Sequence, residues 1–537
     1  MTSFPTSLRE KAAQLVFARI GSNMPPPVTV EEDAARVEAL LERCPLGGLV
    51  LFNGRGPETA RVLARLQARN PYPVLIGTDM ERGVGQQVRG ATVFPHAMAY
   101  AALGAEAEAA VEASARGAAR EALACGIQLA FCPVADVNRD RRNPIIATRA
   151  FGTEPESVAR LVRAYLRGCR AEGLLTSAKH FPGHGGTHQD SHEALPIVTD
   201  TRDVLEHTDL VPFCAAIEAN VDAVMTAHVA FPAFDPSRQP ATASPIILNG
   251  LLREALGFHG PVITDSLLMG AIRAAPGEEG VQAATLVRAG VDIVLDTPDP
   301  EAAVEGLVRA VKTGRLSADR LNEACARVWQ LKQRLIDRFG RSIFTDPSRH
   351  VSPEEVGDAA HDAMAKEVSR RAVSVRDTAG VLPLSPDRVA SEGLLGLLIK
   401  PHRSRLDPPE EPLGSLLRGT FPGAMYHEIG PEADEAIVRR VLEKAGQVRH
   451  VVVAMIVKPA AWHHFGLLPA QHAFVETLVV RRSVVLASLG SPYVLEGFPE
   501  ASAHICTFSD VASSQQALVS VLVEGSEGNN DTHLSRC

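Results

Sequence analysis

The residues of this chain that are best suited to acid–base chemistry gather in one short stretch, 179–192, which reads KHFPGHGGTHQDSH. Four histidines, a lysine and an aspartate occupy these positions, and one proline and three glycines interrupt them. Proline and glycine break regular helices, so the stretch is expected to be a loop. Loops held by a rigid scaffold are where catalytic groups concentrate, which makes this stretch the first place to look for function.

Asp190 and His192 are the pair in this loop that best suits proton transfer. Two residues apart on a loop, the carboxylate can orient the imidazole and stabilise its cation. The pair can then donate and accept a proton near neutral pH. In another setting the same residues would be a turn-capping aspartate beside a surface histidine. The density of titratable groups around them favours the catalytic interpretation.

Two more carboxylates, Asp265 and Asp79, each end a short apolar run. A carboxylate such as Asp265 can attack an electrophilic carbon and form a covalent intermediate, or it can cap the helix that follows. Asp79 is placed to accept hydrogen bonds from sugar hydroxyls, or to pair with Arg82 or Arg89. The residues alone leave these alternatives open.

The histidines at 180, 184, 188 and 192 recur at every fourth position, which on a helix would form a metal-binding face. The proline and glycines between them argue against that helix, and there is no H-E-x-x-H motif. Neither a metal nor a cofactor is therefore expected. The phosphate-loop, serine-elbow and dinucleotide-binding motifs are also missing, so nucleotide use and serine hydrolysis have no support.

Length and composition limit the class of protein. A chain of 537 residues is too long for one hydrophobic core, so at least two domains are expected. A net charge of −9 argues against a nucleic-acid partner or an anionic membrane. No signal peptide and no apolar stretch of membrane-spanning length is visible. Eight scattered cysteines without a C-x-x-C pair favour free thiols in the cytoplasm.

Residues 1–340 alternate short apolar runs with longer amphipathic stretches, which predicts parallel strands joined by helices. Helices are expected at 106–125 and 154–172, among others. The predicted strands are 14–20, 48–53, 74–79, 128–137, 175–180, 223–229, 262–265 and 292–296. Eight such units fit an α/β fold of the (β/α)8 TIM-barrel type, and a doubly wound sheet is the competing architecture.

Five of these strands end at, or just before, a polar side chain: Asn53, Asp79, Asn138, His180 and Asp265. His228 lies near the end of another strand. In a TIM barrel the carboxyl ends of all strands meet on one face. The sequence therefore predicts that these groups, far apart along the chain, come together.

The rest of the chain predicts a second, smaller domain. A charged amphipathic helix at 318–339 closes the barrel domain, and 341–368 is expected to be a linker. An α/β/α sandwich is expected over 369–524. Its predicted strands are 393–399, 451–456 and 483–489, and its predicted helices are 431–445 and 469–479. The polar tail at 525–537 is expected to be disordered.

Taken together, these residues resemble the family-3 glycoside hydrolases, and in particular their bacterial β-N-acetylhexosaminidase branch. That branch carries a loop of the form K-H-F-P-G-H-G-x-T-x-x-D-[ST]-H, which 179–192 matches at every fixed position. Further similarity runs through 131–138, 143–152, 225–228, 240–242 and 262–267, and the segment 371–384 resembles the entry to the family's second domain. The resemblance covers about residues 7–510.

The resemblance implies an exo-acting retaining hydrolase of small saccharides, active in cell-wall (peptidoglycan) sugar recycling. By motif, Asp265 is the nucleophile, His192 the acid/base and Asp190 its orienting partner. The residues that match sugar-holding positions are Asp79, Arg149, Lys179 and His180. Three roles are open for the second domain: covering the active site, mediating a homodimer, or covering the barrel's flank.

Three positions depart from the family pattern. Gly186 stands where the family often has aspartate, and Gln87 stands where a sugar-contacting arginine is common. The C-terminus also lacks the family's usual closing strand. The alternatives to the leading hypothesis are a β-glucosidase, a phosphate-dependent glycosidase, a non-catalytic sugar-binding protein and a metal-dependent hydrolase.

Overall fold

The computed structural model describes residues 4–187, 195–275, 277–403, 408–459 and 465–525. These residues form two compact units. The first is built from the described parts of Met1–Val93, Glu108–Val137 and Glu154–Asp362. The second is built from those of Phe94–Ala107, Asn138–Thr153 and Ala363–Cys537. Two short segments from the first 340 residues thus belong to the second unit, which the sequence pattern did not indicate.

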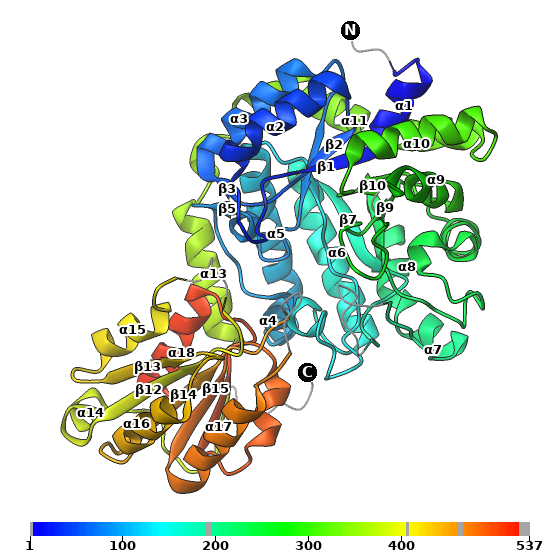
Figure 1. Cartoon of the computed structure of the whole chain (residues 1–537). Coiled ribbons are helices and arrows are strands. Elements are labelled where there is room, and N and C mark those ends of the chain that lie inside the picture. Colours follow the sequence, from blue (N-terminus) through cyan, green and yellow to red (C-terminus); the bar gives the residue numbers. More distant parts are fainter. Residues whose placement is uncertain (1–3, 188–194, 276, 404–407, 460–464, 526–537) are drawn as a thin grey trace. The chain divides into compact units, whose positions relative to one another are not determined.

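Eight parallel strands form the central sheet of the first unit (Figure 1). They are β1 (Val16–Ile20), β2 (Gly48–Leu51), β4 (Leu75–Thr78), β6 (Leu129–Ala130), β7 (Leu175–Phe181), β8 (Ala223–Thr226), β9 (Val262–Thr264) and β10 (Val294–Leu295). Strands β1 to β9 follow one another in chain order, and β10 pairs with β1. A hydrogen bond of 3.0 Å from the Thr264 amide to the Ile293 carbonyl joins β9 to the start of β10.

The sheet therefore closes on itself, and the first unit is a (β/α)8 TIM-type barrel, as predicted. The doubly wound alternative is wrong because such a sheet is open. All eight predicted strands are present, each shortened at one or both ends or, for β7, extended by one residue. The strands are buried along almost their whole length, as parallel strands covered by helices must be.

Helices connect the strands and cover the outside of the barrel (Figure 1). Those of the first unit are α1 (Leu8–Gln14), α2 (Val30–Arg43), α3 (Gly56–Arg69), α5 (Ala107–Ala124), α6 (Pro155–Glu172), α7 (Arg202–His207), α8 (Leu210–Glu218), a π-helix (Ile246–Ala255), α9 (Glu279–Ala289), α10 (Pro300–Lys312), α11 (Ala318–Phe339) and α12 (Ser342–Thr345). Ser7 and Thr29 begin α1 and α2 with reciprocal capping hydrogen bonds to Glu10 and Glu32, which fixes where these helices start.

The barrel interior is packed tightly at Gly77 in β4. A Cβ atom at this position would lie 2.4 Å from the Phe131 ring, so only glycine allows the ring to fill the space beside β4. The two short strands β3 (Gly54–Arg55) and β5 (Val88–Arg89) form a separate pair after β2 and β4. No helix in the described part of the chain is both long and apolar enough to cross a membrane.

The second unit contains a six-stranded sheet in the order β11-β16-β15-β14-β12-β13. Its strands are β11 (Ser374–Asp377), β12 (Leu394–Ile399), β13 (Met425–Ile429), β14 (His450–Met455), β15 (Val484–Ser488) and β16 (Ala503–Cys506). The sequence predicted β12, β14 and β15 and missed the other three. The other pairs in this sheet are parallel, and β11 runs antiparallel to β16.

Helices cover both faces of this sheet, which makes the second unit the predicted α/β/α sandwich. They are α13 (Ala359–Ala372), α14 (Pro386–Glu392), α15 (Pro412–Thr420), α16 (Glu435–Ala445), α17 (Pro469–Arg481) and α18 (Ala512–Glu524). Alternate residues of β12 face opposite cores: Leu395 and Leu397 pack with α16 and α17, and Leu394 and Leu398 pack with α15 and α18.

Three segments of the chain differ from the sequence-based description. The expected linker at 341–368 contains α12 and the first ten residues of α13, so it is partly helical. Segment Phe94–Ala107 carries α4 (Ala97–Ala101), whose Met98 and Ala99 lie in a core of the second unit. Segment Asn138–Thr153 is tied to the same unit by a 2.7 Å ion pair between Arg141 and Glu496.

Candidate active site

Asp265 directly follows β9 and is a partly exposed carboxylate at the carboxyl end of the barrel. Its side chain is 22% exposed, and the Ser266 amide donates a 2.7 Å hydrogen bond to Oδ1. Burial alone would raise the pKa of this carboxyl. The positive charges of His180, His228 and Lys179 and the Ser266 amide outweigh burial and lower the pKa of Asp265 to about 2. The group is therefore ionised at neutral pH.

His180 lies beside Asp265 and is held by a buried carboxylate. Its Nε2 is 4.0 Å from Asp265 Oδ2, and its Nδ1 is 2.7 Å from Asp136 Oδ2. The amides of His180 and His184 also donate to Asp136, at 3.2 and 2.6 Å. Burial raises the pKa of the Asp136 carboxyl, but the two histidines outweigh it and hold the pKa below its ordinary value. Asp136 thus fixes both the ring and the backbone of His180.

Lys179 forms the second charged group of the site. Its ammonium nitrogen lies 2.6 Å from Asp79 Oδ1 and 2.8 Å from Glu81 Oε1. The lysine side chain is only 2% exposed, whereas that of Asp79 is 32% exposed. The cluster therefore presents a carboxylate to the open side, with the neutralising ammonium beneath it.

An irregularity in β7 brings the neighbouring residues Lys179 and His180 to this one site. The pairing between β7 and β8 shifts register between Ala178 and Phe181. In a regular strand, successive side chains point to opposite faces. Here both side chains contact carboxylates of the same site, and the pairing is irregular at these two residues.

His228 lies on the other side of Asp265, after β8. Its Nδ1 is 2.8 Å from the Thr242 hydroxyl, and its Nε2 is 3.2 Å from the Ser266 carbonyl. Burial lowers the pKa of His228, although the nearby Asp265 carboxylate opposes this. His228 therefore supports the loop that carries Asp265.

The described start of the histidine-rich loop is rigidly held. Gly183 has φ of 137°, and a Cβ there would meet the Asp209 side chain at 2.6 Å, so the position requires glycine. His184 Nδ1 lies 2.8 Å from the Thr187 hydroxyl, which also donates to the His184 carbonyl at 3.0 Å. The predicted proton-transfer pair, Asp190 and His192, lies outside the described residues.

The structure thus brings Asp79, Lys179, His180 and Asp265 together at the carboxyl end of the barrel. Arg149 belongs to the second unit, where it ends a short 3₁₀ turn (Ala147–Arg149) and donates 2.9 Å from Nη1 to the Ile145 carbonyl. Its contact with a sugar stays a prediction.

Gln87, one of the departures from the family pattern, has a defined place in the first unit. Its side chain is nearly buried, and its Oε1 accepts a 2.8 Å hydrogen bond from Asn23 Nδ2. Its carbonyl accepts from the Gly54 amide at 2.7 Å. A neutral amide with a fixed partner therefore occupies this position.

Sequence reasoning left three carboxylates of the site without a role: Asp136, Glu81 and Asp296. Asp296 follows β10, accepts a 2.6 Å hydrogen bond from the Ser266 hydroxyl, and pairs with Arg19 at 2.5 Å. A polar residue at the end of a barrel strand was the available signal for Asp296, which ends the predicted strand 292–296. Asp136 lay inside the predicted strand 128–137, so that signal did not mark it. The described residues contain no group of three or more His, Cys, Asp or Glu placed to hold a metal ion.

Comparisons with known proteins identify the family of this chain. The model of the glycosyl hydrolase family 3 N-terminal domain matches residues 7–331. The chain belongs to glycosyl hydrolase family 3, which confirms the resemblance found in the sequence.

Two curated relatives carry related activities in their names. A β-N-acetylglucosaminidase/β-glucosidase from Cellulomonas fimi is 32% identical over 372 residues, which are 67% of this chain and 64% of that protein. This chain thus spans less than two thirds of that relative. A β-hexosaminidase from Xylella fastidiosa (strain 9a5c) is 36% identical over 317 residues, 55% of this chain and 93% of the relative.

A solved structure is similar over nearly the whole chain. The family 3 β-N-acetylglucosaminidase from Paenibacillus sp. str. FPU-7 has a TM-score of 0.83 and 31% sequence identity. The alignment covers 98% of each chain. Both units of this protein therefore have counterparts in that relative.

Proposed function

We propose that this chain is an exo-acting, retaining β-N-acetylhexosaminidase that releases N-acetylglucosamine from the non-reducing end of small saccharides. The observation that carries the proposal is Asp265, a partly exposed carboxylate kept ionised by cationic neighbours at the carboxyl end of a TIM barrel. Support also comes from the names of the relatives, β-hexosaminidase and β-N-acetylglucosaminidase.

In the first step of the proposed reaction, an Asp265 carboxylate oxygen attacks the anomeric carbon. The bond from that carbon to the leaving oxygen breaks as His192 gives a proton to this oxygen. A glycosyl-aspartate ester results. In the second step His192 takes a proton from water, the water oxygen attacks the anomeric carbon, and Asp265 leaves as a carboxylate. Two inversions give net retention.

The low pKa of Asp265 suits the first step, because a nucleophile must be unprotonated when the substrate arrives. His180 and Lys179 supply the positive charge that keeps it so. In the proposal Asp190 orients His192, since a carboxylate next to an imidazole fixes its tautomer and stabilises its cation. This assignment rests on the loop motif.

The sugar is proposed to contact Asp79, Lys179, His180 and Arg149. Asp79 is the most exposed of the carboxylates around Lys179, so its free surface suits hydrogen bonds from sugar hydroxyls. An Asp79→Asn change should therefore raise KM more than it lowers kcat with a good leaving group, because it removes binding that the ground state already uses.

The proposal is tested by a substrate panel on the whole chain. An aryl N-acetyl-β-glucosaminide is compared with the matching aryl β-glucoside, each with and without phosphate. Preference for the N-acetylated substrate, with no effect of phosphate, is expected. Preference for the glucoside overturns the assignment in favour of a β-glucosidase, an activity that the name of the Cellulomonas fimi relative includes. Rate enhancement by phosphate, with a sugar phosphate as product, indicates a phosphorylase.

The roles of individual residues are tested with variants. His192→Ala should slow a substrate with a poor leaving group much more than one with a good leaving group, since only the former needs a proton. His207→Ala is the matched control, because His207 is an exposed histidine on α7 outside the site. Equal losses for both substrates contradict an acid role for His192.

Two other classes make opposite predictions. A non-catalytic sugar-binding protein shows binding without turnover, and Asp265→Asn leaves its sugar affinity unchanged. A metal-dependent hydrolase loses activity with a chelator and regains it with the metal. The proposed enzyme loses turnover on Asp265→Asn and is indifferent to chelator.

The proposed setting is the cytoplasm, with amino-sugar glycosides from cell-wall fragments as substrates. Seven cysteines in the described residues are free thiols, and all but Cys214 are buried, which suits a reducing compartment. Fractionation of cells followed by the aryl N-acetylglucosaminide assay tests the location. Activity confined to the extracellular fraction contradicts it.

A further inference from the structure

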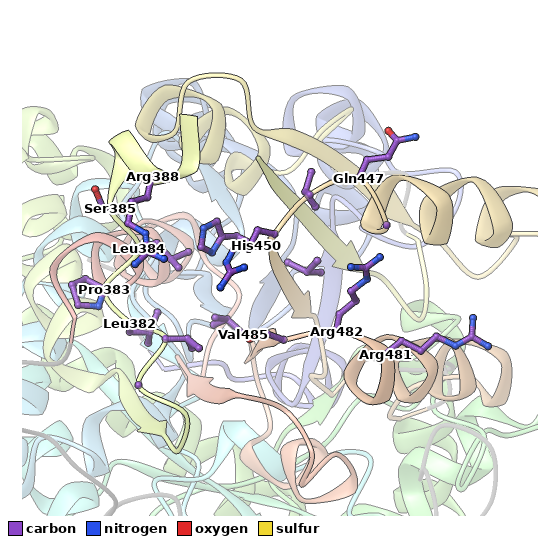
Figure 2. A pocket seen from close by; sticks show the side chains of 17 residues that line it. Leu382, Pro383, Leu384, Ser385, Arg388, Gln447, His450, Arg481, Arg482 and Val485 are labelled. Carbon is purple, nitrogen blue, oxygen red and sulfur yellow. The ribbon is translucent and has the colours of Figure 1, made fainter. Parts of the chain in front are cut away.

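The second unit contains a pocket that the proposed hydrolysis does not use. Its volume is about 900 Å³, and it is formed by three chain segments. The first segment leads into α14 and includes its first turn. The second and third segments lead into β14 and β15 and include the first residues of these strands. The pocket therefore lies at the amino ends of the parallel strands of the second unit (Figure 2).

The lining of this pocket carries positive charge and no acidic residue. Four arginines, Arg388, Arg449, Arg481 and Arg482, and one histidine, His450, are among its 17 lining residues, and none of the 17 is Asp or Glu. The whole chain has a net charge of −9, so such a concentration of cations is not a sample of its average surface. The charge is instead a local property of this pocket.

Neighbouring carboxylates neutralise only part of this charge. Glu392 lies 2.9 Å from His450, 3.5 Å from Arg449 and 3.7 Å from Arg388. A single carboxylate is thus the acidic partner of two arginines and one histidine. Among the described residues, Arg482 has no carboxylate partner. At least two units of positive charge are left without a compensating acid at the pocket.

The arrangement of the side chains suits a ligand held between two cations. Figure 2 shows Arg388 and Arg482 on opposite sides of the pocket, with His450 between them, and Arg481 directed away along its helix. Gly446 lies under the Arg482 guanidinium, which is 3.2 Å from the position that a Cβ would take there. The Arg482 guanidinium therefore packs against the backbone at Gly446.

The floor of the pocket is apolar. Leu384, Val451 and Val485 line it and are almost fully buried. Val451 lies in β14, Val485 lies in β15, and Leu384 precedes α14. A concave site with an apolar floor and a few convergent polar groups is typical of a small-molecule pocket, and its volume is within the usual range for one. Guanidinium groups bind phosphate and carboxylate oxygens in a bidentate manner.

We propose that this pocket is a second ligand site, which binds a small molecule bearing two or more anionic groups, either phosphoryl groups or carboxylates, on a sugar-sized body. A nucleic acid fits less well, because it needs an extended basic surface and would approach a chain of negative net charge. The site does not depend on the glycosidase assignment, and its ligand need not be the substrate.

Isothermal titration calorimetry of the full chain tests the proposal with three probes: glucose 1,6-bisphosphate, citrate and uncharged N-acetylglucosamine. Saturable binding of one anion per chain is expected for the bisphosphate or for citrate, and the stronger of the two identifies phosphoryl or carboxylate recognition. The double variant Arg388→Gln/Arg482→Gln should weaken that binding by about tenfold or more, because each guanidinium makes charged hydrogen bonds.

Two further variants separate a built site from general charge. Arg439→Gln/Arg440→Gln removes the same charge from exposed positions on α16 that do not line the pocket, and should change the affinity by less than about twofold. Ser385→Asp adds a negative charge at the pocket while keeping a residue that begins helices well, so it should fold and bind more weakly.

Three results overturn the proposal. The first is no saturable binding of either anion in the millimolar range. The second is an equal loss in both arginine double variants, which means diffuse charge. The third is binding of an oligonucleotide that small anions do not displace, which assigns the surface to nucleic acid instead.

Discussion

Asp136 is expected to control the geometry of the active site without touching the substrate, and Asp136→Asn is the change that tests this. The carboxylate is completely buried and accepts three hydrogen bonds, two from His180 and one from the His184 amide. In the variant one oxygen can still accept from His184. The new amide group replaces the other oxygen and cannot accept from both donors of His180.

The size of the effect follows from these bonds. A hydrogen bond to a charged group contributes about 1.5–3 kcal/mol, so loss of two should lower the free energy of unfolding by roughly 3–6 kcal/mol. The pKa of Asp136 is lowered in the folded chain, so its stabilisation is present above its ordinary pKa near 3.8 and is lost as pH falls. The difference between wild type and variant should therefore shrink in acid.

Activity should fall as well, because His180 is next to Asp265. A misplaced His180 should reduce kcat/KM on the aryl N-acetyl-β-glucosaminide by about tenfold to a hundredfold. A displaced His180 brings its charge less close to Asp265, so the pKa of Asp265 should rise from about 2. The acid limb of the pH profile of kcat/KM should then move to higher pH.

Asp222→Asn is the matched control. Asp222 precedes β8 at the opposite end of the barrel, where it accepts two hydrogen bonds from Thr176 and pairs with Arg334 at 2.6 Å. This variant should also lose stability, but kcat/KM of the folded protein and the pH profile should stay as in the wild type. Equal kinetic losses in both variants, or wild-type kinetics in Asp136→Asn, would refute the reasoning.

Other predictions concern stability and folding. Lys332 is fully buried, and burial lowers its pKa to about 7 from 10.5, so the unfolded chain binds more protons between these values. Wild-type stability should therefore rise from pH 7 to 10 by up to roughly 5 kcal/mol, and urea unfolding should show no such rise for Lys332→Met. Asp292 is fully buried and pairs with Arg253, Arg320 and Arg327 at 2.6–3.1 Å, so Asp292→Asn should cost about 3–5 kcal/mol in the same assay. Gly183→Ala should lower the melting temperature measured by circular dichroism, because alanine disfavours φ of 137° and its Cβ would meet another side chain at 2.6 Å; an unchanged value contradicts the close contact.

Most of the barrel could be predicted from the sequence because its signals are local. Each strand is a short apolar run, and α11 was located to the residue because its apolar stripe is regular over 318–339. In the second unit β13 was missed, since four of its five residues are only half-buried and its pattern is weak. The edge strand β11 and the short β16 were missed because their pairing brings together residues 374–377 and 503–506, which only the fold can specify.

The sequence by itself determined the family and the barrel and predicted the reactive groups, because motif spacing and hydrophobic period are properties of neighbouring residues. Only the tertiary structure decided how those groups act on one another. The 4.0 Å approach of His180 to Asp265, the hold of Asp136 on His180 and the ammonium of Lys179 between two carboxylates join residues up to about a hundred positions apart. The charge state of Asp265 follows from those contacts, since a pKa depends on the charges that surround a group in space rather than on its neighbours along the chain.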